Sequence, residues 1–289
     1  MTVPKPVTLR HPSLRVAIII AVSIVAILGV ASQAPIPQPS AYHAFADQRR
    51  ILGIPNFWNV VSNLPLLLVG LAGARELARR SPQGALTSLT PAYFCFFLGG
   101  ALVAFGSAYY HLEPSNDTLT WDRLPMSIVF MAFFAIIIGE HVSPSLGRRL
   151  LAPFLLLGLA SVLYWSSSER AHQGDLRLYI LVQYLPAVLI PVILLLFPSR
   201  LSRVGFVWTV VALYALAKLF EAADHLVFSL GQIVSGHTLK HVVAAVGMYV
   251  FLLAVRRRRD SHADAPAPFT EAPPIRAEKS TVKIPANDL

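Results

Sequence analysis

The sequence predicts an all-α integral membrane protein, a bundle of hydrophobic helices that cross the bilayer. Of its 289 residues, 55% are hydrophobic and only 13% are charged, and the mean hydropathy is +0.59. Soluble domains carry about 25% charged residues. The charges and prolines fall between long apolar runs, as expected where lipid surrounds those runs. Because the runs reach about twenty residues without alternating polarity, they are expected to be helices and not strands of a membrane barrel.

Eight apolar runs are long enough to cross a bilayer. Their expected bounds are 15–32, 57–74, 91–111, 123–139, 150–166, 178–197, 204–222 and 237–255. Basic residues at Lys5, Arg10 and Arg15 precede the first run, so it fits either an extra N-terminal helix or a cleavable signal segment. The other seven form the predicted core.

Three regions follow from these runs. Residues 1–46 form an N-terminal hydrophobic segment and linker, residues 47–256 the seven-helix domain, and residues 257–289 a disordered, basic and proline-rich tail. Fourteen Lys and Arg residues lie on the side of the N-terminus and seven on the other side, so the positive-inside rule places both termini in the cytoplasm. The formal charge of +9 does not indicate a nucleic-acid partner, because the basic residues lie in short loops and in the run 256–259.

Four polar residues in the spans have a spacing of four. Ser107 and His111 lie near the end of the span 91–111, and His237 and His241 lie at the start of the last span. Residues four apart share one face of a helix, and two such histidines can bind one metal ion. By the predicted orientation, all three histidines lie at the non-cytoplasmic face. Ionisable groups at membrane depth are costly, so each is expected to have a partner or a function.

Three carboxylates are expected at the same level. Asp122 opens the next span, and Glu221 and Asp224 lie at the end of the span 204–222. Three neutral imidazoles with one open coordination position suit a catalytic zinc ion, which polarises a carbonyl group and makes a bound water ionise near neutral pH. Asp122 is placed to move the water proton to a leaving amine, and Ser107 to donate a hydrogen bond to the developing oxyanion. Asp224 or Glu221 is expected to hold a ligand imidazole by its other nitrogen.

Four other histidines, His43, His141, His172 and His262, are expected to be solvated, and His225 remains unassigned.

The chain resembles the alkaline ceramidases, seven-helix membrane hydrolases related to the adiponectin-type receptors. The resemblance covers residues 47–256 and rests on the run Phe57-Trp58-Asn59-Val60-Val61-Ser62-Asn63, on Ser107 and His111 followed by Asp122, and on Gly236-His237-Thr238-Leu239-Lys240-His241. It implies a zinc ion bound by His111, His237 and His241, with Ser107 and Asp122 as catalytic partners, and hydrolysis of the linear amide C–N bond of a ceramide-like N-acyl lipid.

One part of the family pattern differs. The eukaryotic members carry an acidic, calcium-binding stretch before the Phe-Trp-Asn motif, and here that region reads Asp47-Gln48-Arg49-Arg50, with Asn56 where an acidic residue would be expected. Calcium is therefore a doubtful cofactor.

Two other functions remain open. A non-enzymatic receptor or scaffold would use the same bundle with a structural zinc ion, although such sites normally have a fourth protein ligand. A transporter would pass protons along Glu221, Asp224 and His225, but the cytoplasmic halves of the spans offer almost no ionisable residues to continue that path. The sequence does not indicate an oligomeric state.

Overall fold

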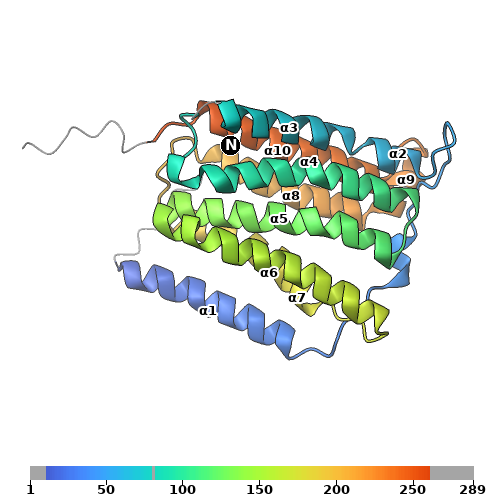
Figure 1. The fold of residues 1–289 in the computed structure, drawn as a ribbon, viewed down its shortest axis with the longest axis horizontal. Coiled ribbons are helices and arrows are strands. Elements are labelled where there is room, and N and C mark those ends of the chain that lie inside the picture. The colour runs from blue at the N-terminus through green and yellow to red at the C-terminus, as the bar shows by residue number, and fades with distance from the viewer. Residues whose placement is uncertain (1–10, 80–81, 261–289) are drawn as a thin grey trace, which may run out of the picture.

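The computed structural model describes residues 11–79 and 82–260 of the chain. Eight helical segments in these residues are long and apolar enough to cross a membrane, which confirms the predicted all-α membrane bundle (Figure 1). They are α1 (Pro12–Ala31), α2 and α3 together (Phe57–Val61 and Leu64–Arg79), α4 (Thr90–Leu112), α5 (Asn116–His141), α6 (Pro144–Arg170), α7 (Arg177–Leu196), α8 (Gly205–Ala222) and α10 (Gly236–Arg257). A short helix, α9 (Asp224–Gly231), connects the last two spans.

Several spans are longer than the sequence predicts because polar caps extend them beyond the apolar run. Ser115 caps α5, where its side chain accepts the backbone N–H of Thr118 and the Thr118 hydroxyl receives the backbone N–H of Ser115. Asp122 therefore lies in the second turn of α5 and does not open the helix. Ser235 caps α10 by accepting the backbone N–H of Thr238 at 3.1 Å.

The break between α2 and α3 follows from Pro65. A proline has no N–H, so the carbonyl of Val61 loses its normal helical donor at this position. Within the break, side chains bond to the backbone of the preceding turn: Asn63 Nδ2 donates to the carbonyl oxygen of Asn59 at 2.8 Å, and Ser62 Oγ donates to the same oxygen at 3.2 Å. The first core span is thus interrupted between Val61 and Leu64.

The spans lie side by side and roughly parallel to one long axis (Figure 1). Successive helices α3, α4, α5 and α6 pack against one another, and α5 is the most buried span. Helix α10 packs against both α8 and α3, so the last span lies beside the first span of the core. This arrangement brings the start of α10 next to the end of α4.

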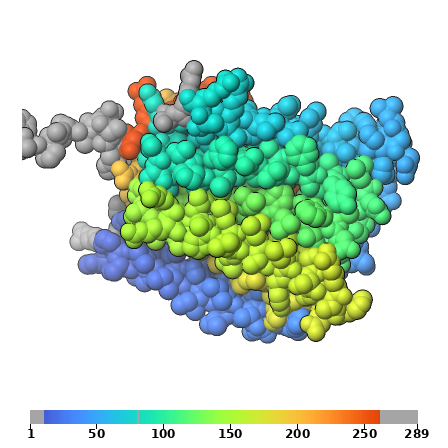
Figure 2. Space-filling view, in the orientation of Figure 1, coloured from blue at the N-terminus to red at the C-terminus, as the bar shows by residue number. Residues whose placement is uncertain are grey.

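Helix α1 lies outside the core bundle. None of its residues is buried, and it packs against α7. Figure 2 shows it as a separate strip along one edge of the molecule. The seven later spans therefore make their core contacts without it, whether or not the segment is retained.

A buried ion pair lies at the end of the bundle where both α5 and α10 end. It was not predicted from the sequence. Both terminal nitrogens of Arg258 donate to the Glu140 carboxylate, at 2.7 and 2.8 Å, and neither side chain is exposed. Tyr93 donates its hydroxyl proton to the same carboxylate at 2.7 Å. Arg258 is thus a structural residue beyond the predicted tail boundary at residue 257. This half of the bundle, which the positive-inside rule predicts to be cytoplasmic, does hold ionisable groups. Residues 261–289 lie outside the described part of the chain.

Candidate metal centre

Three histidines meet at one end of the bundle, where α4 ends and α10 begins. We call this the histidine end. The ligand atoms of His111, His237 and His241 all lie within 4.8 Å of one another, and all three residues are buried. Their ring centroids are 4.9 to 5.1 Å apart. The three histidines that the sequence predicts as ligands could therefore hold one metal ion.

The hydrogen bonding of these rings fits a metal. Neither ring nitrogen of His111 makes a hydrogen bond, and Nε2 of His237 makes none. Buried polar atoms without partners are costly and rare in folded proteins, and an ion that accepts the lone pair of one nitrogen in each ring would remove part of this cost. The donor set, three imidazole nitrogens, is one that zinc prefers.

The ring of His241 is oriented from a third helix. Its Nδ1 lies 2.9 Å from Ser62 Oγ. Because the Ser62 hydroxyl proton is directed to the Asn59 carbonyl, we assign the hydroxyl oxygen as the acceptor of an Nδ1–H of His241. Nε2 of His241 is then the nitrogen free to bind a metal. Ser62 thus performs the task that the sequence analysis gave to a carboxylate.

Ser107 and Asp122 come together beside the histidines. Both are buried, and the Ser107 hydroxyl lies near the Asp122 carboxylate without making a hydrogen bond of ordinary geometry. Gly106 permits this approach, because a Cβ at this position would collide with the carbonyl oxygen of Trp121. α4 and α5 therefore pack most closely where their polar residues face each other.

The contacts of Asp224 and Glu221 differ from the predicted ones. Asp224 accepts the backbone N–H of His237 at 2.7 Å and that of Ala46 at 2.9 Å, so it holds the start of α10 and not an imidazole ring. Glu221 forms ion pairs with Lys218 and Lys240. Both carboxylates lie near this end of the bundle, and their partners are backbone N–H groups and lysines in place of imidazole rings.

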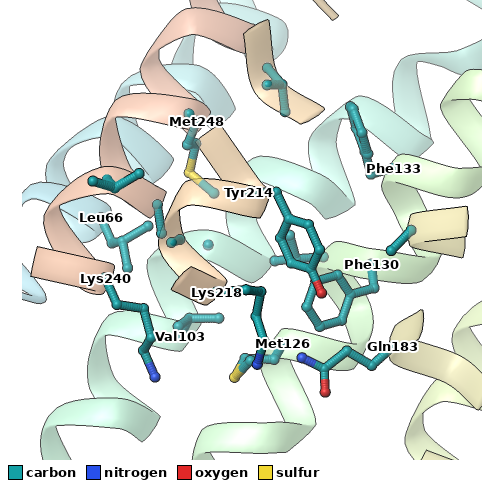
Figure 3. Close-up of a pocket in the computed structure, with 18 of the residues that line it drawn as sticks. Leu66, Val103, Met126, Phe130, Phe133, Gln183, Tyr214, Lys218, Lys240 and Met248 are labelled. Carbon is teal, nitrogen blue, oxygen red and sulfur yellow. The ribbon is translucent and has the colours of Figure 1, made fainter. Parts of the chain in front are cut away.

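A cavity extends from the histidine end into the bundle (Figure 3). Its volume is about 220 Å³, and Ser107, Asp122 and His241 line one part of it. The remainder is mostly apolar, with walls from α3, α4, α5, α7, α8 and α10. From Ser107 to Phe96, which also lines the cavity, α4 rises about 16 Å, so the apolar part has the depth of a lipid chain segment.

Phe45 packs on two of the histidines and is not among the side chains that line this cavity. It is buried, and its ring centroid lies 4.6 Å from those of both His111 and His237. The segment that carries it, between α1 and α2, was predicted only as a linker. An aromatic residue in a loop has no periodic pattern that would have identified this contact.

The chain matches a known protein family over most of its length. A family model described as Ceramidase matches residues 53–268. The chain belongs to the ceramidase family. A comparison with curated proteins found no match. The match confirms the family that the sequence motifs predicted. Membership in this family implies a membrane-embedded hydrolase that acts on amide bonds of a lipid.

The motif Phe57 to Asn63 has a clear structural role in this ceramidase-family chain. Asn59 Oδ1 accepts the Thr238 hydroxyl at 2.8 Å, which connects the motif to α10. Asn56, just before the motif, donates from Nδ2 to the carbonyl oxygen of His111 at 2.9 Å. Together with Ser62, these residues hold both histidine-bearing helices in place.

The stretch before the Phe-Trp-Asn motif contains an ion pair. Arg49 donates to both carboxylate oxygens of Asp47 and to the carbonyl oxygens of Gln232 and Ile233. Burial of Asp47 raises the pKa of its carboxyl group, but the hydrogen bonds from Arg49 outweigh this effect and lower it below the ordinary value. The guanidinium group thus already supplies a cation to this carboxylate.

The other histidines show two departures from expectation. His141 is buried, and its Nδ1 donates to the carbonyl oxygen of Phe197 at 3.0 Å. His43 lies within hydrogen-bond distance of the Tyr110 hydroxyl, at 2.8 Å, and of Asn116. Neither is simply solvated. His172 is exposed as expected, His225 is exposed beside the carbonyl of Ala44, and His262 lies outside the described residues.

Proposed function

We propose that the protein is a zinc-dependent membrane amidase that hydrolyses the N-acyl amide of a ceramide-like lipid. The observation that carries this proposal is that the three buried histidines meet at one end of an apolar cavity, which His241, Ser107 and Asp122 line. A purely structural metal site would not need either residue or an adjoining cavity.

Zinc is the metal that the donor set favours. Among the described residues, the histidine cluster contains three nitrogen ligands and no cysteine or carboxylate, which is the pattern of a catalytic site with an open position. When bound, zinc would polarise the amide carbonyl and supply an ionised water near neutral pH.

In the proposed reaction, Asp122 transfers a proton and Ser107 donates a hydrogen bond. Asp122 accepts a proton as the water oxygen attacks the carbonyl carbon, and it returns that proton to the nitrogen when the C–N bond breaks. Ser107 donates a hydrogen bond to the carbonyl oxygen as negative charge develops there. The products are a fatty acid and an amine.

Entry of the substrate from the lipid phase is consistent with the surroundings of the site. Phe45 packs on two of the histidines, while the cavity that His241 lines continues among apolar side chains. An acyl chain in the cavity would place its amide at the polar end, beside Asp122 and Ser107. By the positive-inside rule, we propose that the histidine end faces the non-cytoplasmic side and that the C-terminus is cytoplasmic.

Metal analysis combined with an activity assay tests the proposal. The purified full-length protein is expected to contain about one zinc per chain and to cleave fluorescent ceramide or another N-acyl lipid, with activity lost on chelation and restored by zinc. His111→Ala should lose both metal and activity, whereas Asp122→Asn should keep the metal and lose about 100-fold or more in turnover. His225→Ala, an exposed histidine at the same end, is the matched control.

Two results would contradict the mechanism. Undiminished hydrolysis by His237→Ala would show that the three-histidine site is not required. Retained zinc without turnover on any N-acyl lipid would instead favour a receptor or scaffold in which the metal is structural.

A further inference from the structure

Three charged side chains form a cluster on the wall of the cavity. Lys218 and Glu221 come from α8 and Lys240 from α10, and all three line the cavity together with Asp122 and His241. In Figure 3, Lys218 and Lys240 extend in the same direction, toward the part of the cavity where Met126 and Gln183 lie. We call Lys218 and Lys240 the lysine pair.

The lysine pair shares one carboxylate. Lys240 Nζ donates to Glu221 Oε1 at 2.9 Å, and Lys218 Nζ donates to Glu221 Oε2. Each ammonium group uses one of its three N–H donors on Glu221, which leaves further donors available. Two ammonium groups therefore share one bridging carboxylate on a largely apolar wall, and Asp122 is a second carboxylate on the same wall.

Charged groups at this depth are costly unless each has a partner. The side chains of Glu221 and Lys240 are each only 16% exposed, and that of Lys218 is 31% exposed. Opposite charges attract more strongly here than in water, because the surroundings are apolar. An anionic group that enters the cavity would meet ammonium N–H donors that Glu221 leaves unused.

The position of the lysine pair indicates which part of a substrate it contacts. Lys240 immediately precedes His241 and interacts electrostatically with Asp122, the residue proposed to protonate the leaving nitrogen. The apolar walls farther along the cavity, formed by residues such as Phe96, Phe133 and Met248, suit the acyl chain. The lysines therefore lie near the amine side of the scissile amide.

We propose that Lys218 and Lys240, bridged by Glu221, form an anion-binding subsite that selects N-acyl lipids carrying an acidic group, such as a carboxylate, on the amine side of the scissile amide. This inference rests on the proposed amidase function and narrows its substrate class. The same chemistry would also recognise the carboxylate of the released fatty acid, and the test distinguishes the two sources.

The test compares two substrates that differ by one charge. The full-length zinc-loaded protein is given a long-chain N-acyl amino acid and its neutral carboxamide, with the same acyl chain, and kcat/KM is measured for each. The wild type should prefer the acid by about tenfold or more, the effect of a hydrogen bond to a charged group. Lys218→Met and Lys240→Met should each reduce this preference, and Lys→Arg at either position should restore most of it.

Glu221→Gln provides a control of opposite sign. This variant removes the competing carboxylate while keeping both lysines, so the preference for the acid should rise. If the three residues served only to hold α8 against α10, Glu221→Gln and the lysine variants would all change the two substrates equally. That result would overturn the subsite.

Two further measurements, inhibition by free fatty acid and equilibrium binding of the two lipids, complete the test. If the lysine variants weaken inhibition by free fatty acid but leave the substrate preference unchanged, the anion recognised is the product carboxylate and the proposal is wrong. If the protein hydrolyses neither substrate, the amidase function fails, and the subsite is judged by equilibrium binding of the same two lipids. Stronger binding of the acid, lost in Lys240→Met, would support it, and equal binding would overturn it.

Discussion

Replacement of Ser62 by alanine tests whether the first core span controls the metal centre. Ser62 Oγ lies 2.9 Å from Nδ1 of His241, and this hydrogen bond helps to orient the ring. The substitution removes the acceptor but no metal ligand and little volume. We expect Ser62→Ala to fold and to bind zinc more weakly.

The size of the effect follows from the role of the hydrogen bond. Loss of a partner that orients a metal-bound histidine typically lowers metal affinity by about 10- to 100-fold. This corresponds to about 1.4 to 2.7 kcal/mol in binding free energy. At saturating zinc the turnover number should stay close to that of the wild type, because Asp122 and Ser107 are unchanged.

Zinc affinity is measured by competition with a chelator of known affinity, on detergent-solubilised full-length protein. Ser161→Ala is the matched control: its buried hydroxyl donates to the carbonyl of Gly158 within its own helix and has no contact with the histidines. Equal zinc affinity in Ser62→Ala and the wild type would refute the assigned role of Ser62. Equal weakening in both variants would attribute the effect to general destabilisation.

Three other perturbations test the packing around the site. Glu140→Gln should lower the free energy of unfolding by about 3 to 5 kcal/mol in denaturant titrations, because the buried Arg258 loses its counter-charge. Gly106→Ala should reduce amidase activity by about a hundredfold, because its Cβ would push α4 away from the carbonyl of Trp121 and displace the catalytic residues. Asp175, between α6 and α7, is ionised in the folded protein down to low pH, since the hydrogen bond from Arg177 lowers its pKa from 3.8 to about 2. Its stabilising effect is present above pH 3.8 and is lost as the pH falls through about 2, so the stability difference between the wild type and Asp175→Asn should shrink over that interval.

Each of these predictions has a control or a contrary outcome. Glu76→Gln breaks a more exposed ion pair with Arg256 and should cost less than about 1 kcal/mol; a loss equal to that of Glu140→Gln would contradict the importance of burial. Gly29→Ala adds a methyl group in open space on α1 and should leave activity unchanged. For Asp175→Asn, a stability difference that stays constant down to pH 2 would be inconsistent with the lowered pKa.

The sequence alone was enough to predict the membrane spans and the histidine cluster. Transfer of a side chain into lipid depends mainly on its own chemistry, so composition along the chain identifies the helices. The spacing of four places His237 and His241 on one helix face without any knowledge of the neighbours. The positive-inside rule then predicted that the span ending at His111 and the span beginning at His237 meet at the same face of the bundle.

Only the tertiary structure decided which partners these residues have. Ser62 reaches His241, Phe45 covers His111, and Arg258 pairs with Glu140 across 118 residues of chain. Such contacts depend on the rotation of each helix about its axis and on which helices become neighbours, and neither quantity is encoded in local composition or spacing. For that reason the carboxylates expected to hold the imidazole rings, Asp224 and Glu221, were located correctly along the chain but given the wrong partners.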